Sequence, residues 1–336
     1  MTTTTLGGSA VRVTPLALGC AAIGNLYRAV TDEAALATVD AAWDAGVRTF
    51  DTAPHYGLGL SERRLGEALR GRPRDSYTVS TKVGRLLVPD TTAGPGDDLA
   101  DGFAVPATHR RVWDFTADGV RRSLEESLDR LGLDRVDTVL LHDPDRHAEQ
   151  ALREAYPALE RLRAEGVVGA VGVGMNQCAL PARFLRETDI DVVLLAGRYT
   201  LLDQEGLAEV LPEAAARGRG VIIGGVFNSG LLTAPRPGAT YDYAPAPRPV
   251  LDRALRLREV TARHGVPLRA AALHFPFGHR AVASVLTGAR SPDEVRDTVG
   301  HLRRPVPDAL WDDLRAEGLL GPGAPVPVDP PLEEPS

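Results

Sequence analysis

The sequence predicts an α/β protein in which eight parallel strands alternate with helices and close into one barrel. Eight short apolar runs alternate with segments whose apolar residues have helical spacing. Several of these runs end in polar side chains, and a parallel barrel gathers its reactive groups just past the strand ends. The 336 residues are enough for one large barrel, although length alone would also permit two domains.

The predicted strands are expected to be buried on both faces, because each is a short run rich in Val, Ile or Leu. They cover residues 16–20, 47–51, 77–81, 136–141, 168–173, 192–195, 221–225 and 282–287. The helices between them are predicted from apolar residues that recur every three or four positions. They cover residues 32–45, 61–70, 116–131, 151–165, 179–187, 204–216, 250–263 and 268–275. We therefore expect one (β/α)8 barrel of the TIM type over residues 1–320.

Two long connections depart from a minimal barrel. Residues 83–114 follow the third strand and are rich in Gly, Pro, Asp and Thr, so they cannot form a short turn. We expect them to overhang the rim of the barrel. The Pro-rich residues 233–249 follow the seventh strand. Residues 321–336 are rich in Pro and Glu and are expected to form a flexible tail.

The composition favours small-molecule chemistry over binding to nucleic acid or to a membrane. A formal charge of −7 and a pI near 5.7 leave no basic footprint for nucleic acid and no polybasic patch for anionic lipid. No apolar stretch approaches the roughly 20 residues of a membrane-spanning helix. Cys20 and Cys178 form no paired framework, which suits a reducing compartment. We expect a cytoplasmic protein, and no feature of the sequence indicates its oligomeric state.

Three strand ends carry polar side chains that make chemical sense as a set. The motif at residues 46–57 contains the second strand and the turn that follows it. It supplies a carboxylate at Asp51 and a phenol at Tyr56. The third strand ends in an amine at Lys82, and the fourth ends in an imidazole at His142. In a parallel barrel these strand ends converge on one rim, so the four groups are predicted to form one proton-transfer site.

Each of the four groups has an expected role. A free phenol has a pKa of about 10 and is a poor acid or base at neutral pH. A nearby ammonium lowers the pKa of the phenol, and a carboxylate keeps that ammonium charged and in place. We therefore expect Tyr56 to carry the proton, Lys82 to tune its pKa, Asp51 to orient Lys82, and His142 to hydrogen-bond a substrate oxygen. Each residue alone has an ordinary structural explanation, but four such accidents together are improbable.

These motifs resemble the catalytic tetrad of the aldo-keto reductase superfamily over about residues 10–300. The resemblance implies the barrel fold and an NAD(P)-dependent oxidoreductase. The motifs that support it are Gly46 to Gly57 with Ser61-Glu62 and Leu65-Gly66, Thr81-Lys82, Leu141-His142, Gly172 to Asn176, and Leu286 to Ser291. Residues 142–145 and 196–203 look most like the bacterial aldose dehydrogenase branch. That branch is similar to L-fucose (D-threo-aldose) dehydrogenases, L-galactose dehydrogenases and pyridoxal 4-dehydrogenase.

The resemblance implies that NAD or NADP lies across the barrel mouth. Residues 233–249, which follow the seventh strand, could fold over it. No Gly-x-Gly-x-x-Gly segment follows a strand and opens a helix, so a Rossmann domain is not supported. In the family arrangement, Asn176 would hydrogen-bond the carboxamide and Tyr199 would stack beneath the nicotinamide ring. The family often has Gln shortly before that Tyr, where this chain has Gly197 and Arg198. A loop would wrap the pyrophosphate with backbone amides, and it consists of Phe227, Asn228, Ser229, Gly230 and Leu231.

The turn after the last strand is the second phosphate-binding segment that the resemblance implies. Gly288 and Arg290 precede Ser291, which could cap a helix whose amide groups face phosphate. Many NADP-selective relatives have Arg or Gln where this chain has Glu294. A carboxylate there would repel a 2′-phosphate and so favours NAD, whereas the guanidinium of Arg290 favours NADP. Thr298 stands where the family often has Asn near the adenine. Taken together, Glu294 and Arg290 favour NAD over NADP.

The resemblance implies oxidation of the anomeric hydroxyl of an aldose, or of another hemiacetal such as pyridoxal, to a lactone. The same residues would run the reverse reaction in an NADPH-dependent aldehyde or ketone reductase. The substrate is a small sugar or carbonyl compound in either case. Trp113 and Phe115 stand at the end of the long insertion. They either line a sugar-sized pocket or clamp the start of the next helix.

Two functions of other classes stay open. A cofactor-binding regulatory protein could keep this fold without turnover, although an intact tetrad argues against it. A metal-dependent barrel hydrolase would need a ligand cluster. Residues 142–147 contain His and Asp side chains but match no recognised ligand spacing, so we predict no metal site.

Overall fold

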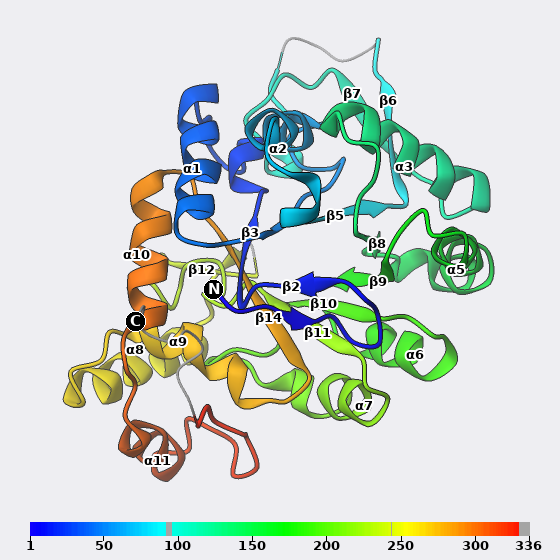
Figure 1. The fold of residues 1–336 in the computed structure, drawn as a ribbon. Helices are drawn as coiled ribbons and strands as arrows, with labels where there is room; N and C mark the ends of the chain where they lie inside the picture. The colour runs from blue at the N-terminus through cyan, green and yellow to red at the C-terminus, as the bar shows by residue number, and fades with distance from the viewer. Residues whose placement is uncertain (92–95, 243, 329–336) are drawn as a thin grey trace.

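The computed structural model describes residues 1–91, 96–242 and 244–328, in which eight parallel strands form a closed barrel (Figure 1). Each strand pairs with the next along the chain, and the last pairs with the first. The barrel strands are β3 (Leu16–Gly19), β4 (Thr49–Asp51), β5 (Thr78–Val83), β8 (Thr138–His142), β9 (Ala170–Met175), β10 (Val192–Ala196), β11 (Gly220–Gly224) and β14 (Val282–Gly288). This confirms the predicted (β/α)8 barrel.

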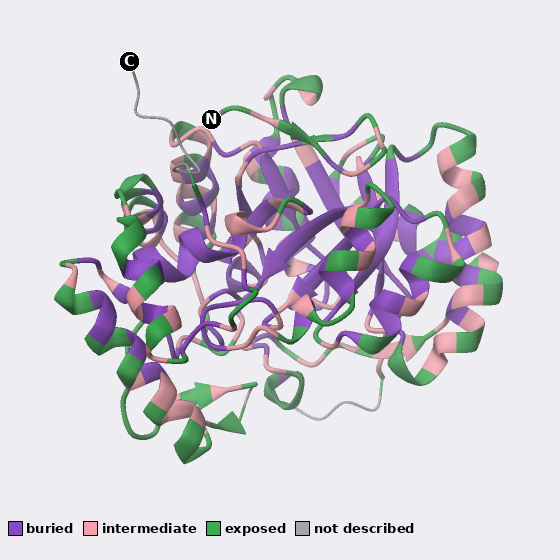
Figure 2. Cartoon of the chain, turned by 90° about the horizontal axis from the view of Figure 1, so that it is seen from below, coloured by how far each residue is buried: buried purple, intermediate pink, exposed green. Residues whose placement is uncertain are grey.

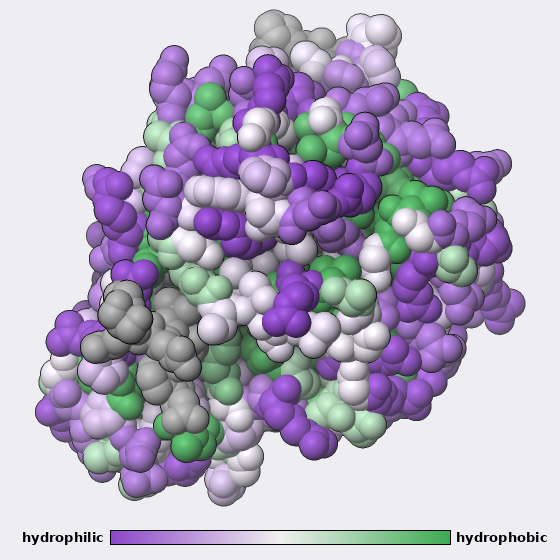
Figure 3. All heavy atoms as spheres, in the orientation of Figure 1, coloured by the Kyte–Doolittle hydropathy of each residue, from purple (hydrophilic) through white to green (hydrophobic). Residues whose placement is uncertain are grey.

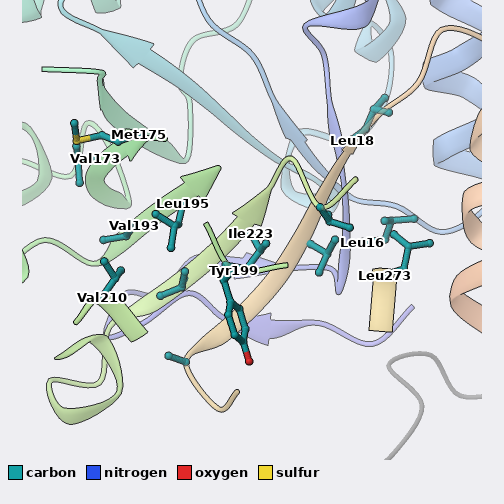
Figure 4. Close-up of a cluster of buried hydrophobic side chains, with 14 of the residues drawn as sticks. Leu16, Leu18, Val173, Met175, Val193, Leu195, Tyr199, Val210, Ile223 and Leu273 are labelled. Carbon is teal, nitrogen blue, oxygen red and sulfur yellow. The ribbon is translucent and has the colours of Figure 1, made fainter. Parts of the chain in front are cut away.

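The strands are buried on both faces because their side chains alternate between two apolar layers (Figure 2). Along β10, Val192 and Leu194 belong to the cluster inside the barrel. Val193 and Leu195, which point the other way, belong to the cluster beneath the helices (Figure 4). This period of two is the one expected of a strand, and it explains why the apolar runs are continuous.

Helices surround the barrel, and several of them begin at side-chain caps. Thr31 accepts from the backbone N–H of Ala34 at 3.2 Å, and Thr116 accepts from that of Gly119 at 3.0 Å, so both satisfy free helix-end donors. The helices of the described residues are α1 (Asp32–Asp44), α2 (Leu60–Leu69), α3 (Ala117–Leu131), α4 (Ala148–Gln150), α5 (Tyr156–Ala164), α6 (Ala179–Glu187), α7 (Val210–Ala216), α8 (Arg248–Arg263), α9 (Leu268–His274), α10 (Pro292–Arg303) and α11 (Asp308–Ala316). A π-helical turn at Ala151–Ala155 joins α4 to α5.

A short N-terminal hairpin closes one end of the barrel. Its strands, β1 (Thr4–Thr5) and β2 (Arg12–Val13), pair antiparallel, and Leu6, Val11 and Val13 pack with the side chains of the barrel interior. This hairpin was not predicted from the sequence, because two-residue strands show no periodicity. Figure 3 views the hairpin end, where hydrophilic side chains surround scattered apolar ones. The hairpin leads directly into the start of β3, so it lies at the N-terminal ends of the barrel strands. The C-terminal strand ends, which carry the polar side chains, lie at the opposite end of the barrel.

The two long connections lie at that opposite end, the bottom of Figure 2. After β5 the chain forms an antiparallel hairpin of β6 (Arg85–Pro89) and β7 (His109–Trp113), with a short 3-10 turn, η3 (Leu99–Asp101), between them. After β11 it forms a smaller hairpin of β12 (Thr240–Tyr241) and β13 (Ala244–Pro245). Both insertions are therefore where the sequence predicted them.

The last described residues pack against the barrel. Gly321 donates its backbone N–H to Gln204 Oε1 at 2.9 Å, and Ala324 is buried. A Cβ atom on Gly278 would lie 2.5 Å from the carbonyl oxygen of Pro325, so the two backbones nearly touch. Residues 329–336 lie outside the described residues, and the flexibility expected of the tail stays a prediction there.

We predict that Gly66→Ala destabilises the protein, because Gly66 lets α2 touch the end of α3. An added Cβ would lie 1.9 Å from the carbonyl oxygen of Leu131, so one helix must move. Overpacking of this kind costs about 1–3 kcal/mol. The control is Gly300→Ala in α10, where a Cβ meets nothing within 4 Å and the better helix propensity of Ala adds about 0.5–1 kcal/mol. Urea unfolding measures both, and equal stabilities would contradict the prediction.

Candidate active site

The predicted tetrad meets at the end of the barrel opposite the hairpin. Lys82 Nζ donates to Asp51 Oδ2 at 2.6 Å, to the backbone oxygen of Thr52 at 3.0 Å and to the hydroxyl of Tyr56 at 3.0 Å. Ser80 donates to the other oxygen of Asp51 at 2.7 Å. These bonds fix the carboxylate on both sides and direct the ammonium toward the phenol. They arise because β4 and β5 are neighbours that pair in parallel.

The ammonium of Lys82 stays charged although it is buried. Burial lowers its pKa, but the attractions of Asp51 and Tyr56 outweigh burial and raise the pKa above its ordinary value. For Tyr56 the balance is the reverse, since burial raises the pKa of the phenol more than Lys82 lowers it. Lys82 lowers the pKa of the phenol as expected, but burial and Asp51 raise it by more, so the net pKa of Tyr56 lies above its ordinary value. Its phenol is protonated at neutral pH.

His142 faces the phenol from β8. Its ring centroid lies 5.9 Å from that of Tyr56, and the two rings are perpendicular. Burial, together with the positive charges of Arg85 and Lys82, holds the pKa of His142 well below its ordinary value. The imidazole is therefore neutral and can donate or accept one hydrogen bond at a substrate oxygen without adding charge.

A cavity of about 580 Å³ opens beside these residues. It is large enough for a small organic ligand. Its polar lining includes Tyr27, His55, Tyr56, Lys82, Arg85, Asp101, His142, Asp143 and Asn176, and its apolar lining includes Leu26, Leu99, Phe103, Met175 and Leu194. The tetrad residues Tyr56, Lys82 and His142 thus share one cavity, while Asp51 lies behind Lys82.

The insertion after β5 builds one wall of this cavity. Residues 99–103 line it, and Arg111 from β7 holds them in place by binding both oxygens of Asp98, at 2.8 and 2.5 Å, and Asp101 at 3.0 Å. Because Arg111 and Asp98 are both nearly buried, this contact is shielded from water. The insertion that was expected to overhang the rim therefore forms a wall of the cavity, which the Arg111 contacts hold in place.

Trp113 and Phe115 are not among the residues that line the cavity. Phe115 is fully buried beneath Gly84, where a Cβ atom would lie 2.2 Å from its ring and where φ is +104°. Trp113 is more exposed than Phe115 and stacks on the guanidinium of Arg85, whose Cζ is 4.3 Å from a Trp113 ring centroid. These contacts fit the second alternative, an apolar clamp ahead of α3.

Tyr199 lies away from the barrel mouth. Its side chain is fully buried, its ring lies 5.0 Å from that of Phe275, and its neighbours are apolar residues beneath the helices (Figure 4). Its hydroxyl has no hydrogen-bond partner within the described residues. This position does not fit the expected stacking beneath a nicotinamide ring. The Arg198 side chain beside it turns outward and binds Asp242 of the β12–β13 insertion.

The residues expected to bind phosphate lie at the same end as the tetrad. The loops after β11 and β14 are neighbours, because these strands pair in parallel. In the first loop, Asn228, Ser229 and Gly230 have positive φ angles of 46°, 56° and 88°. The backbone makes a tight left-handed turn there, which the N–H of Leu231 closes by donating to the carbonyl of Asn228 at 3.1 Å. Asn228 donates to the carbonyl of Gly197 at 3.1 Å, so its side chain braces the loop. Phe227 and Leu231 flank it, and Leu231 is buried.

The second loop leads into α10 as expected. Ser291 caps the helix by accepting from the backbone N–H of Glu294 at 3.3 Å, and Glu294 Oε2 accepts from that of Arg290 at 2.8 Å. Arg290 Nε is enclosed without a partner among the described residues. Gly288 is exposed at the strand end, and Thr298 follows one turn after Glu294 and is nearly buried. An exposed helix start beside an unpaired guanidinium nitrogen suits an anionic ligand.

Several residues that line the cavity were not singled out from the sequence, and three of them stand beside tetrad members. His55, Arg85 and Asp143 each stand within three residues of a tetrad member. Arg85 forms an ion pair with Asp143, whose backbone has a φ of +43°. Their position within three residues of a tetrad member was the one feature of the sequence that could have identified them as cavity residues. Within the described ranges no group of three or more His, Cys, Asp or Glu side chains is placed to hold a metal ion, and no helix has the length and apolarity to cross a bilayer.

The comparisons with known proteins agree with this geometry. The aldo/keto reductase family model matches residues 15–316. The chain is 47% identical over 309 residues to D-threo-aldose 1-dehydrogenase of a Pseudomonas species, covering 91% of this chain and 94% of that protein. It is 42% identical over 332 residues to pyridoxal 4-dehydrogenase of Microbacterium luteolum, covering 94% and 97%.

A solved structure shows the same fold. The holo form of an aldo-keto reductase from Bacillus halodurans matches with a TM-score of 0.75 at 25% identity, covering 99% of this chain and all of that one. The family match spans most of the chain, and the relatives align over nearly their whole length. The chain belongs to the aldo/keto reductase family.

Proposed function

We propose that the protein is an NAD-dependent dehydrogenase that oxidises the anomeric hydroxyl of an aldose, or of an equivalent hemiacetal, to a lactone. The observation that carries the proposal is the buried ammonium of Lys82, held between the carboxylate of Asp51 and the phenol of Tyr56 at a cavity wall. The related D-threo-aldose 1-dehydrogenase and pyridoxal 4-dehydrogenase support this choice of substrate class.

The reaction needs a proton acceptor and a hydride acceptor. A bound nicotinamide cofactor would supply the hydride acceptor for the anomeric carbon. Tyr56 takes the hydroxyl proton, and Lys82 stabilises the phenolate form because it is a fixed positive charge 3.0 Å from the phenol oxygen. Neutral His142 hydrogen-bonds the same substrate oxygen and orients it. The oxygen then forms the lactone carbonyl. In reverse, Tyr56 returns the proton to a carbonyl oxygen.

The cavity lining supports a substrate with several hydroxyl groups. Besides the tetrad it presents a guanidinium at Arg85, carboxylates at Asp101 and Asp143, and an amide at Asn176. Such a mixture of donors and acceptors suits sugar hydroxyls, each of which can donate and accept. Phe103 and Leu26 supply an apolar wall for the C–H face of a ring.

The proposal of NAD over NADP depends on Glu294. Its side chain is partly exposed at the start of α10, and Arg28 lies 3.9 Å from it. The 2′-phosphate of NADP would have to approach this carboxylate, and the two negative charges would repel each other. Asn176, exposed at the edge of the cavity, is proposed to bind the carboxamide. The two cysteines are buried and unpaired, which supports a cytoplasmic location for the enzyme.

A substrate panel tests the proposed function. The protein is incubated with NAD or NADP and with L-fucose, other aldoses or pyridoxal, and the absorbance of reduced nicotinamide is followed. We expect turnover with at least one aldose or with pyridoxal, and Tyr56→Phe is expected to lose about 10²–10⁴-fold in kcat because only the proton path is removed. Nucleotide affinity should stay nearly unchanged. Equal turnover by Tyr56→Phe would exclude Tyr56 as the proton carrier.

We expect the oxidation rate to rise with pH. Burial raises the pKa of Tyr56, so below that pKa the reactive phenolate fraction grows about tenfold for each pH unit. The reverse reduction uses the phenol and should stay level over the same range. Initial rates from about pH 6 to 9 in both directions measure this. A decline in oxidation with rising pH would contradict the proposed role.

We expect Glu294→Gln to improve the use of NADP relative to NAD by about two- to fivefold, the effect of one partly exposed charge. Gln keeps an oxygen for the backbone N–H of Arg290, so the start of α10 is preserved. The matched control is Asp293→Asn in the same helix turn, where the carboxylate faces solvent. The ratio of kcat/KM for the two nucleotides is measured, and an unchanged ratio in Glu294→Gln would contradict the assignment.

A further inference from the structure

His55 is a cavity residue to which the tetrad mechanism gives no task. It directly precedes Tyr56, and its ring centroid lies 6.0 Å from that of Tyr56 and 5.7 Å from that of His142. Phe103 packs edge-on against it at 5.1 Å. The imidazole is therefore held beside the reacting groups and lines the same cavity.

Arg111 determines which nitrogen of His55 carries the proton. Its Nε–H donates to His55 Nδ1, and its Nη2 donates to the backbone oxygen of His55 at 3.1 Å. A guanidinium has no acceptor and does not lose its proton in proteins, so Nδ1 must be the unprotonated nitrogen. A neutral His55 then has its single proton on Nε2.

The surroundings keep His55 neutral. Burial, and the positive charges of Arg85, Arg111 and Lys82, lower its pKa to about 2. Nε2 has no hydrogen-bond partner among the described residues. His55 is thus a fixed donor that lacks an acceptor, set in the wall of a ligand cavity.

We infer that His55 donates its Nε2–H to a second oxygen of the substrate, next to the hydroxyl that Tyr56 deprotonates. This inference rests on the proposed function, because it requires a substrate with more than one oxygen near the reacting carbon. His55 would then help to select polyhydroxylated substrates over simple aldehydes and would take no part in the proton transfer.

Two variants separate this role from a structural one. The amide nitrogen of Gln overlays Nε2 of His, whereas the amide oxygen of Asn overlays Nδ1. His55→Gln therefore keeps the donor toward the cavity and gives up the Arg111 contact. His55→Asn keeps the Arg111 contact and gives up the donor.

The kcat/KM of each variant is measured with the best aldose of the substrate panel and, in the reverse direction, with butyraldehyde, which has only one oxygen. We expect His55→Asn to lose about three- to tenfold with the aldose, the effect of one neutral hydrogen bond, and to match the wild type with butyraldehyde. His55→Gln should stay close to the wild type with both. Nucleotide affinity controls for an intact site.

Two results would overturn the inference while leaving the proposed function intact. One is a loss in His55→Gln with full activity in His55→Asn, which would make His55 an anchor for the inserted wall. The other is an equal effect of both variants on the aldose. A wild-type protein that oxidises no aldose and no pyridoxal would overturn the proposed function itself.

The tautomer is tested on the unmodified protein, so this test does not depend on the activity of any variant. Two-bond ¹H–¹⁵N NMR distinguishes the Nε2–H form of histidine from the Nδ1–H form and from imidazolium. One signal, assigned by its absence in His55→Asn, should report the Nε2–H form from about pH 5 to 8. An Nδ1–H form or titration near the ordinary pKa would contradict it.

Discussion

The site depends on one buried positive charge. Lys82 is 2% exposed and has three oxygen partners from the β4 side of the barrel, so its ammonium is both desolvated and fully hydrogen-bonded. Removing either partner of a buried ion pair leaves an uncompensated charge that costs about 3–5 kcal/mol. The barrel supports this arrangement because neighbouring parallel strands bring their ends to the same rim. The same positive charge lowers the cost of ionising Tyr56 and helps to keep His142 neutral.

The fold and the tetrad were predictable from the sequence because both follow from local patterns. Buried parallel strands produce continuous apolar runs, and Asp51, Lys82 and His142 occupy the ends of three of them. Properties that depend on distant packing were not predictable. The net pKa of Tyr56 results from burial, which no motif shows, and the N-terminal hairpin has strands too short for periodicity. Tyr199 was assigned by motif position alone, but its ring is buried among apolar residues outside the barrel mouth.

The insertion after β5 builds one wall of the cavity that contains the tetrad. Its Arg111 connects the inserted wall through Asp98 and Asp101 to the loop that carries Tyr56, through the backbone and side chain of His55. Wall and proton carrier are thus fixed to each other by one buried guanidinium. Specificity and chemistry are therefore physically connected, although they come from separate parts of the sequence.

Lys82 makes the phenol of Tyr56 a better acid than it would be without the ammonium beside it. An ultraviolet difference titration against Tyr56→Phe reports the pKa of this one phenol, in the wild type and in the double variant Asp51→Asn/Lys82→Met, which removes both charges and leaves neither unpaired. Because Lys82 acts on the phenol more strongly than Asp51 does, the pKa of Tyr56 should be higher in the double variant. An equal or lower pKa there would contradict the claim.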